Sequence, residues 1–367
     1  MTEDEDARFM HMALALGRRA EGMAWPNPAV GCVIVKAGRV LGRGWTQPGG
    51  RPHAEPTALV QAGAAAQGAT AYVSLEPCAH HGKTPPCSQA LIDAKLARVV
   101  YAIADPDPRV AGQGAAMLRQ ASIEVRDDVL KEEAARAHRG FFQRLTTGRP
   151  RLTLKLASSF DGRIATATGE SQWITGPLAR RAVHAARARH DAILVGAGTA
   201  RADNPMLSVR DMGPRRQPVR VVTSRRLDLP LDGHLATTAN DIPLWLFHGK
   251  DASAAARQAW SERGARLFEV PLTGRQIDVA ALLKTLGEAG LTSIFCEGGG
   301  ALAASLLAAD LVDDLIGFTA GIALGAEGQP SIGAMGLDRL AEAPRFKLLG
   351  TRRIGADIEH SWTRLSP

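Results

Sequence analysis

Aromatic residues, cysteines and long apolar runs are all scarce in this sequence. Aromatic residues make up 5% of the 367 residues and do not alternate with basic ones, so no platform for stacking nucleic-acid bases is indicated. Four cysteines are too few for a disulfide framework in a chain of this length and indicate thiols or metal ligands. No apolar run is long enough to span a membrane, and the acidic start, MTEDEDARFM, lacks the basic flank of an export signal. We therefore expect a cytoplasmic protein with no membrane partner.

The remaining composition is typical of an ordinary globular protein. Hydrophobic residues make up 45% and charged residues 22%, which excludes collagen-like, low-complexity and disordered chains. The formal net charge of +7 is spread over both halves, so we expect no nucleic-acid partner. A phosphorylated small molecule would need only a few Arg or Lys side chains and is compatible with this balance. The length predicts two domains.

Helix-like and strand-like patterns alternate along the chain and restart after TTGRP, residues 146–150. We therefore predict two α/β domains, residues 1–147 and 148–367. In the first, the patterns predict helices over 6–19, 54–66, 86–94 and 130–144 and strands over 29–36, 39–45, 70–75 and 98–103. In the second, they predict helices over 177–189, 279–289 and 301–309 and strands over 151–157, 192–196, 219–223, 243–247 and 293–296. No internal repeat relates the halves, so we expect two different sites.

One histidine, one glutamate and two cysteines form a candidate metal site in the first half. His53 and Glu55 open a predicted helix, and Cys78 and Cys87 each follow a proline near the start of the next. One imidazole and two thiolates leave a fourth tetrahedral position open for water, as catalytic zinc requires and structural zinc does not. A helix start favours the thiolate form of cysteine. Glu55 can reach such a water without binding the metal, which suits proton transfer.

This pattern matches H-x-E followed by P-C-x-x-C, the signature of zinc deaminases, except that eight residues separate Cys78 from Cys87. The segment 77–87, PCAHHGKTPPC, resembles the insertion of the riboflavin-pathway pyrimidine deaminases. That resemblance implies a cytidine-deaminase-like three-layer α/β fold. It also implies one zinc ion held by His53 and the two cysteines, with Glu55 as the proton carrier.

Other segments of the first half resemble the same family. In PNPAVG, the resemblance places Asn27 against the pyrimidine edge. Thr46 stands where the family often has His, and Asp107, in ADPDP, stands in a substrate loop where Asn is commoner. The adjacent histidines at positions 80 and 81 stay outside the predicted metal shell, because such pairs on polar loops are more often solvated or substrate-facing.

A glycine run marks a second candidate site in the second half. IFCEGGGAL, residues 294–302, leads from a predicted strand through three glycines into a helix. Glycines allow the backbone to approach a ligand closely, and the free N–H groups of a helix start bind phosphate. The signal is weak by itself, because it is not G-x-G-x-x-G and a tight strand-to-helix turn has the same sequence character.

Further segments resemble the reductase half of bifunctional riboflavin-pathway enzymes, which has a dihydrofolate-reductase-like fold and uses NADPH. These segments are KLASSFDGR (155–163), GESQWIT (169–175), GTARADNP (198–205) and LSVR (207–210). The residues that the resemblance places against NADPH are Ala157, Trp173, Thr199, Asp203, Ser224, Gly299, Gly300, Ala301, Leu302, Ala303, Ala304 and Ser305. Those it places against the substrate are Ser171, Arg187, Leu207, Arg210 and Glu297.

Two groups of these residues have an evident chemical use. Arg187 and Arg210 suit a phosphate group, because guanidinium donors bind it bidentately. Lys155, Asp203 and Glu297 form a polar trio that the resemblance places around the ribose C1′, where ring opening and protonation occur, without indicating which one donates the proton.

Both halves together resemble one bifunctional family of riboflavin biosynthesis, in which a zinc-dependent pyrimidine deaminase precedes an NADPH-dependent reductase. The resemblance implies a phosphorylated pyrimidine substrate and a homo-oligomer, either a dimer or a tetramer. Two alternatives remain open. One is a nucleoside or RNA deaminase whose second half only binds substrate. The other is a zinc-stabilised binding module without turnover, which would need a fourth protein ligand besides the three available.

Overall fold

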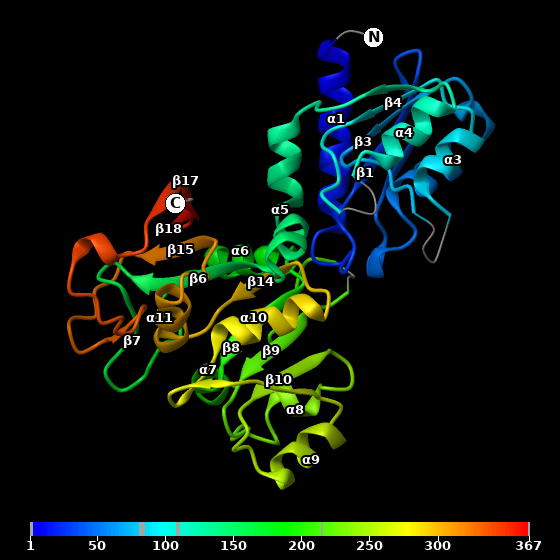
Figure 1. Ribbon diagram of the computed structural model, residues 1–367. Coiled ribbons are helices and arrows are strands. Elements are labelled where there is room, and N and C mark those ends of the chain that lie inside the picture. Colours follow the sequence, from blue (N-terminus) through cyan, green and yellow to red (C-terminus); the bar gives the residue numbers. More distant parts are fainter. Residues whose placement is uncertain (1–2, 81–84, 108–110, 214–215, 366–367) are drawn as a thin grey trace. The chain divides into compact units, whose positions relative to one another are not determined.

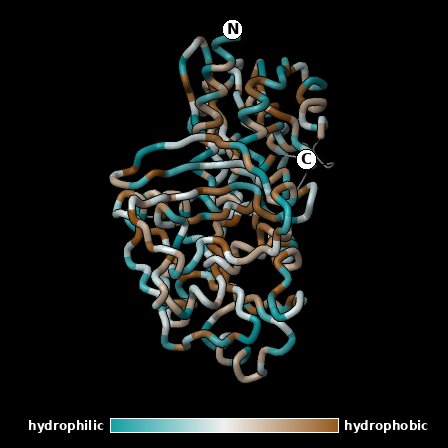
Figure 2. Tube along the Cα trace, turned by 90° about the vertical axis from the view of Figure 1, so that its left-hand side faces the viewer, coloured by the Kyte–Doolittle hydropathy of each residue, from teal (hydrophilic) through white to brown (hydrophobic). Residues whose placement is uncertain are grey.

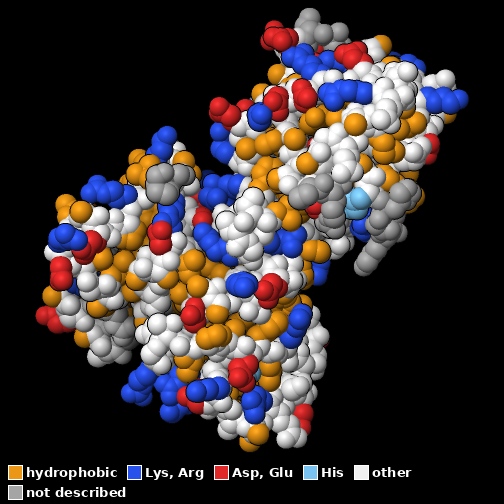
Figure 3. Space-filling model, in the orientation of Figure 1, with side chains coloured by type: hydrophobic (Ala, Val, Ile, Leu, Met, Phe, Trp, Pro, Cys, Tyr) orange, Lys and Arg blue, Asp and Glu red, His pale blue; other side chains and the backbone are white. Residues whose placement is uncertain are grey.

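The computed structural model of the chain describes residues 3–80, 85–107, 111–213 and 216–365. They form two compact units, Met1–Gly148 and Arg149–Pro367 (Figure 1). None of the described helices combines the length and the apolar content that a membrane crossing needs. Figure 2 shows hydrophobic residues concentrated within the units, and Figure 3 shows basic and acidic side chains interspersed on the face in view.

The first unit is a five-stranded sheet between two layers of helices. Its helices are α1 (Glu3–Gly17), α2 (Ala54–Ala62), α3 (Cys87–Asp93), α4 (Gln113–Gln120) and α5 (Lys131–Thr147). Its strands are β1 (Gly31–Lys36), β2 (Arg39–Trp45), β3 (Thr70–Val73), β4 (Arg98–Tyr101) and β5 (Glu124–Arg126). The strand order is β2-β1-β3-β4-β5, with β1 antiparallel to both neighbours and β3, β4 and β5 parallel.

Alternate residues of β1 face opposite helix layers, because successive side chains of a strand point to opposite sides of the sheet. Val33 packs in one apolar cluster with Phe9 of α1, and α5 contributes to the same cluster. Ile34 packs in the other with Ala58 of α2, and α3 and α4 complete that layer. The predicted three-layer fold is therefore confirmed.

Helix α2 lies directly against β2 at a glycine. A Cβ atom on Gly44 would lie only 2.0 Å from the carbonyl oxygen of Ala54, so no larger residue fits without moving the helix. This contact fixes the start of α2, where His53 and Glu55 lie.

The second unit is built on a nine-stranded sheet. Its helices are α6 (Pro177–Arg187), α7 (Ala197–Asp203), α8 (His234–Thr237), α9 (Ala254–Glu262), α10 (Val279–Glu288) and α11 (Gly300–Ala308). The strands of the large sheet are β6 (Arg151–Ser159), β8 (Ala192–Gly196), β9 (Val219–Thr223), β10 (Leu244–His248), β11 (Arg266–Glu269), β14 (Ser293–Cys296), β15 (Asp314–Ala320), β17 (Phe346–Ile354) and β18 (Asp357–Arg364). Short pairs are formed by β7 (Arg163–Ala165) with β16 (Gln329–Pro330) and by β12 (Leu272–Thr273) with β13 (Gln276–Ile277).

The large sheet has the order β11-β10-β9-β8-β14-β6-β15-β18-β17. It is parallel from β11 to β15, and β18 and β17 add an antiparallel ribbon at one edge. The run AILV of β8 is buried throughout, as expected for a parallel strand covered on both faces. Neighbouring parallel strands β8, β14 and β6 end at the same edge of the sheet, where the second candidate site lies.

Most predicted elements are confirmed, and the differences have local causes. Strands predicted over 192–196, 219–223 and 293–296 match β8, β9 and β14. The helix predicted over 54–66 ends earlier, because Gly63 adopts a left-handed φ of 55° and a short 3₁₀ turn follows. Helices α4 and α9 and strands β5 and β11 were not predicted, since their few large apolar residues give no clear repeat.

Candidate active sites

A cavity of about 320 Å³ in the first unit collects the residues of the candidate metal site. Its lining includes Asn27, His53, Glu55 and Cys78. His53 is the residue before α2 and Cys87 is the first residue of α3, so both predicted helix starts are confirmed. The ligand atoms of His53, Cys78 and Cys87 lie within 4.8 Å of one another. Three residues far apart in the sequence thus meet, and two of them, His53 and Cys78, line the cavity.

The chemistry of these three side chains fits zinc. Nδ1 of His53 lies 3.2 Å from Sγ of Cys87 and 3.8 Å from Sγ of Cys78, and the backbone N–H of Cys87 donates to Sγ of Cys78 at 3.3 Å. Hydrogen bonding to Cys87, followed by that to His53, lowers the pKa of Cys78, although burial opposes this shift. These hydrogen bonds favour the thiolate, which is the form that binds metal. Imidazole and thiolate ligands are those that zinc prefers, so these residues would hold the ion.

Glu55 lies in the first turn of α2 and is 4% exposed. Burial raises the pKa of its carboxyl group, and the Cys78 sulfur raises it further, whereas His53 lowers it. A carboxyl group with a raised pKa can take up and release protons closer to neutral pH, as a general acid and base must.

Asn27 and Thr46 line the same cavity as His53. The amide Nδ2 of Asn27 donates to the carbonyl of Gly50 at 2.9 Å and lies 3.2 Å from Nε2 of His53. Asn27 therefore contacts the imidazole as well as the cavity. The hydroxyl of Thr46 donates to the carbonyl of Pro28 at 2.9 Å and is buried, so it supports the segment that carries Asn27.

Some lining residues were missed by the sequence analysis. Glu76, after β3, and Phe141 and Arg144 of α5 line the cavity with Asp107. A lone acid just before a Pro-Cys pair, in an otherwise apolar run, was an available signal for Glu76. The sequence analysis placed no site residue on the helix predicted over 130–144, which corresponds to α5. His80 lines the same cavity, whereas His81 lies outside the described residues.

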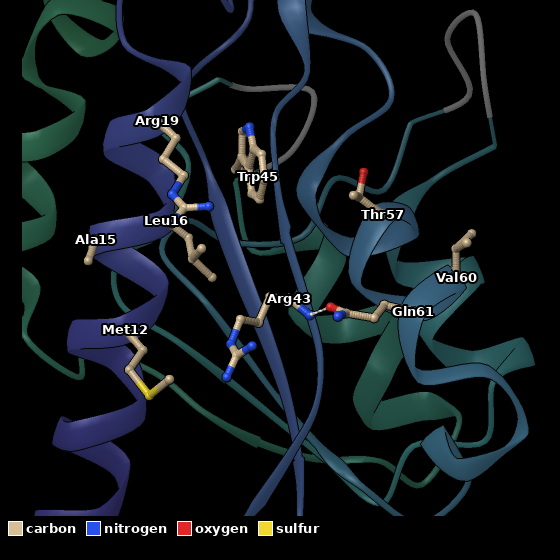
Figure 4. A pocket seen from close by; sticks show the side chains of 9 residues that line it. All are labelled: Met12, Ala15, Leu16, Arg19, Arg43, Trp45, Thr57, Val60 and Gln61. Carbon is tan, nitrogen blue, oxygen red and sulfur yellow. Dashed lines mark hydrogen bonds between the residues drawn. The ribbon is translucent and has the colours of Figure 1, made fainter. Parts of the chain in front are cut away.

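A second hollow in the first unit has a different character. It has a volume of about 670 Å³ and opens over β2 between α1 and α2 (Figure 4). Its lining contains Met12, Trp45 and Val60 and no acid, histidine or cysteine. The guanidinium of Arg19 lies 4.9 Å from the Trp45 ring centroid. Without groups for proton transfer or metal binding, this hollow is not a candidate catalytic site.

The second unit brings a polar cluster to the edge of its sheet. Lys155 comes from β6, Glu297 follows β14 and Asp203 ends α7. Nζ of Lys155 lies 4.0 Å from Oε2 of Glu297. Arg187, at the end of α6, donates from Nε to Oε1 of Glu297 at 2.5 Å, from Nη2 to Oε2 at 3.1 Å, and from Nη1 to the carbonyl of Ser208 at 2.9 Å. Arg187, expected to bind phosphate, is thus engaged with Glu297.

Burial and charge act together in this cluster. Burial lowers the pKa of Lys155, with a further lowering by Arg187, although Glu297 and Asp203 oppose it. Burial raises the pKa of Asp203, while Lys155 lowers it. The pKa of Glu297 is lowered, because the attraction of Arg187 and its hydrogen bonds outweigh the raising effect of burial. The charged form of Glu297 is therefore favoured, and Arg187 holds it in place. Beside it, the pKa values of Lys155 and Asp203 are shifted towards each other.

The glycines of the second site differ in their surroundings: one is tightly packed, and the others border open space. A Cβ on Gly300 would lie 2.5 Å from the carbonyl oxygen of Pro330, so packing requires that glycine. A Cβ on Gly198 would meet nothing within 4 Å, and one on Gly299 would meet only Oγ1 of Thr199, at 3.5 Å. The N–H of Gly299 also donates to that Oγ1 at 3.1 Å. The open space at Gly198 and Gly299 fits the close approach of a dinucleotide pyrophosphate.

Other residues predicted to bind NADPH have side chains engaged elsewhere. Ser224 is buried and its hydroxyl donates to a carboxylate oxygen of Asp228 at 2.8 Å. Ala303 and Ala304 are buried in the core, and the hydroxyl of Ser305 donates to a backbone carbonyl within α11. Of the predicted residues on α11, Ala301 is exposed and Leu302 and Ser305 are partly exposed, so these side chains can meet a ligand.

The remaining predicted residues lie on loops and strands of the second unit. Trp173 is 67% exposed, and the guanidinium of Arg180 lies 4.5 Å from its ring centroid. Leu207 is buried, whereas Arg210 is exposed and donates its backbone N–H to Nδ1 of His184 at 3.3 Å. Ala157 of β6 and Ser171 are partly exposed.

The fold and sites define a class of protein: a zinc-type deaminase unit followed by a dihydrofolate-reductase-like unit. Two sequence-family models match the chain. The RibD C-terminal domain matches residues 150–359, and the cytidine and deoxycytidylate deaminase zinc-binding region matches residues 3–103. The riboflavin biosynthesis protein RibD of Escherichia coli is 42% identical over 366 residues, covering 96% of this chain and 98% of that protein. RibD of Bacillus amyloliquefaciens is 38% identical over 352 residues, covering 96% and 94%. The chain belongs to the RibD family.

Solved structures agree with this assignment. RibD of Acinetobacter baumannii superposes with a TM-score of 0.89 at 37% identity and full coverage of both chains. A diaminohydroxyphosphoribosylaminopyrimidine deaminase/5-amino-6-(5-phosphoribosylamino)uracil reductase of Thermotoga maritima gives 0.86 at 32% identity, again with full coverage. The chain is accordingly a bifunctional enzyme of riboflavin biosynthesis, with zinc in the deaminase unit and NADPH as the reductant.

Proposed function

We propose that residues 1–147 deaminate 2,5-diamino-6-(5-phosphoribosylamino)pyrimidin-4(3H)-one and that residues 148–367 then reduce the ribosyl group of the product to a ribityl group. The convergence of His53, Cys78 and Cys87 beside the buried Glu55 carries the deaminase assignment. The contacts among Lys155, Glu297 and their neighbours carry the reductase assignment.

In the deaminase unit, His53, Cys78 and Cys87 hold the metal and Glu55 moves protons. Zinc, when bound there, would activate a water for attack at ring carbon C2. The Glu55 carboxylate would carry a proton from the attacking water to the departing amino group, so that ammonia leaves as oxygen enters. Asn27 orients the imidazole of His53 and faces the pyrimidine.

In the reductase unit, the polar cluster surrounds the ribose carbon C1′. Bound NADPH supplies the hydride. Asp203 and Lys155 are the groups that exchange protons with the opening sugar ring, because burial brings their pKa values towards each other. Glu297, held in place by Arg187, orients the substrate, and Arg210 attracts its phosphate. Ser171 contacts the substrate, and Ala157, Trp173, Thr199, Gly299, Gly300, Ala301, Leu302 and Ser305 contact NADPH. The buried Leu207, Ser224, Ala303 and Ala304 are left with backbone contacts.

A coupled assay tests both assignments on the full-length, zinc-loaded enzyme. Ammonia release and NADPH loss are followed with the diaminopyrimidine ribosyl phosphate, with cytidine as the comparison substrate. In Glu55→Gln, ammonia release falls by about 100- to 10,000-fold, while bound zinc and reduction of the supplied deaminated intermediate are kept. If the enzyme releases ammonia from the diaminopyrimidine ribosyl phosphate but consumes no NADPH when the deaminated intermediate is supplied, the reductase assignment is refuted. If it releases ammonia from cytidine and not from the diaminopyrimidine, the proposed substrate is refuted.

We further expect a homo-oligomer, a dimer or a tetramer, acting in the cytoplasm. Leu348 and Leu349 on the edge strand β17 and Ile358 on β18 are each about half exposed, which favours contact with a second copy. Light scattering after gel filtration, on the wild type and on Leu349→Lys, tests the oligomer. Cell fractionation tests the location.

A further inference from the structure

Glu76 is a buried acid at the wall of the deaminase cavity. It lies three residues beyond the end of β3 and two before Cys78, and it is 3% exposed. Its own N–H donates to the carbonyl of Ile103 at 2.9 Å, so the backbone around it is fixed to the segment after β4. A buried carboxylate is costly unless hydrogen bonds replace the lost water.

Three backbone N–H groups from a single stretch of chain supply those hydrogen bonds. Oε2 of Glu76 accepts from Gly112 at 3.0 Å and from Asp105 at 3.4 Å, and Oε1 accepts from Ala115 at 3.2 Å. Gly112 is the residue before α4, so two of the donors belong to the start of a helix, which favours a negative charge. Among the described residues, all hydrogen-bond partners of this carboxylate are backbone amides.

The same contacts position two acids of the cavity. Asp105, held by Glu76, accepts the N–H of Asp107 at 2.9 Å, and both acids line the cavity with Glu55. The start of α4 also packs on the chain next to Cys78, since a Cβ on Gly114 would lie 1.9 Å from the carbonyl oxygen of Pro77.

We propose that Glu76 is a positioning residue of the deaminase: its carboxylate ties the strand end that presents Cys78 to Asp105 and to the start of α4, and so sets how Asp105 and Asp107 face the substrate. The inference rests on the proposed deaminase function. Glu76 touches neither the metal ligands' donor atoms nor the reacting atoms through any hydrogen bond in the described residues, so it acts through the segment that it holds.

Glu76→Gln tests the proposal in the full-length, zinc-loaded enzyme. The amide keeps the shape but presents one acceptor oxygen and an NH₂ group to three N–H donors, so the start of α4 and Asp105 shift. We expect the KM of the diaminopyrimidine ribosyl phosphate to rise about tenfold or more, with kcat within about threefold, one zinc per chain, and unchanged reduction of the deaminated intermediate.

Asp6→Asn is the matched control. Asp6 is also a buried carboxylate of the first unit, and it accepts from Arg98, Arg126 and Tyr72, away from the cavity. Its loss lowers the Tm without changing the deaminase KM. If Glu76→Gln behaves like this control, with a lower Tm and a KM within twofold of wild type, Glu76 is purely structural and the proposal is overturned.

A double-mutant cycle with Asp105→Asn gives a second readout. If Glu76 acts through Asp105, the fold-change in KM of the double variant is much smaller than the product of the two single fold-changes. If the double variant shows that full product, the two residues act independently and the proposal is overturned. Should Glu76→Gln fail to fold, Glu76→Asp replaces it, because the shorter carboxylate keeps its charge but cannot reach both Gly112 and Ala115; an unchanged KM there also overturns the proposal. A wild-type enzyme that releases no ammonia refutes the deaminase function itself, which separates the two failures.

Discussion

The guanidinium of Arg187 holds the carboxylate of Glu297 through two hydrogen bonds, although 110 residues separate them in the sequence. Both side chains are largely buried, with 14% and 9% of their surfaces exposed. The third donor of Arg187 binds the carbonyl of Ser208, in the segment that carries Leu207 and Arg210. One guanidinium thus fixes the orientation of Glu297 and the position of the adjacent substrate segment.

Arg187→Lys replaces this planar pair of donors with a point charge. The loss of a hydrogen bond to a charged group costs about 1.5–3 kcal/mol, so we expect the reductase kcat/KM to fall roughly 10- to 100-fold. Deaminase activity is unchanged, because all the contacts of Arg187 described above lie in the second unit. Arg181→Lys, at an exposed position of the same helix, is the control. Equal reductase activity in the two variants would contradict the role of the pair.

Zinc removal frees the thiol of Cys78 for reaction. Cys78 and Cys87 are the expected ligands, but only Cys78 is partly exposed, whereas Cys87, Cys32 and Cys296 are buried. Chelation is therefore expected to abolish ammonia release, to leave reduction of the deaminated intermediate intact, and to make one thiol per chain, that of Cys78, reactive towards a disulfide reagent under native conditions. Zinc analysis and thiol titration before and after chelation measure this; four reactive thiols, or none, would contradict the assignment.

The metal site was accessible from the sequence for a physical reason. His53 and Cys87 stand at helix starts that apolar spacing and proline mark, so a local pattern indicated their geometry. The pairing of Arg187 with Glu297 had no such signal, because it depends on the order of strands in the sheet and not on periodicity. Glu76 could be noticed as a lone acid before a Pro-Cys pair, but its role could not be predicted, because its partners lie up to 39 residues further along the chain.

The close contact between β2 and α2 makes Gly44 a sensitive position. A Cβ there would lie 2.0 Å from the carbonyl oxygen of Ala54 and 2.6 Å from the nitrogen of Ala58, and neither backbone can move without shifting α2. Since α2 carries Glu55 and begins beside His53, Gly44→Ala is expected to lower deaminase activity at least tenfold and to destabilise the first unit by about 1–3 kcal/mol. Ammonia release and calorimetry measure the two effects.

Gly38→Ala is the matched control for that substitution. Gly38 lies in the turn between β1 and β2, where a Cβ would meet nothing within 4 Å, but its φ is +72°. The left-handed backbone costs alanine about 1 kcal/mol, so we expect a lower Tm with unchanged deaminase activity. Similar activity losses in both variants would show that general destabilisation, and not movement of α2, is the cause.

Finally, the stability of the first unit depends on His138. This side chain of α5 is 2% exposed, and its Nε2 lies 3.0 Å from the carbonyl of Ser74 at the end of β3. Within the described part of the chain its Nδ1 has no hydrogen-bond partner, so protonation would bury a second N–H without an acceptor. Burial accordingly lowers the pKa of His138 to about 4.

Because the folded state has the lower pKa, the unfolded state binds more protons between about pH 4 and pH 6.5. The contribution of His138 is therefore complete above pH 6.5 and is lost as the pH falls through that range, and at pH 5 it has decreased by about 2 kcal/mol. His138→Gln retains a donor for Ser74 but does not titrate. Calorimetry at pH 7 and pH 5 should show that the first unit loses less stability in the variant than in the wild type. The second unit should lose the same stability in both proteins. An equal pH dependence in both proteins would mean that the proton goes elsewhere.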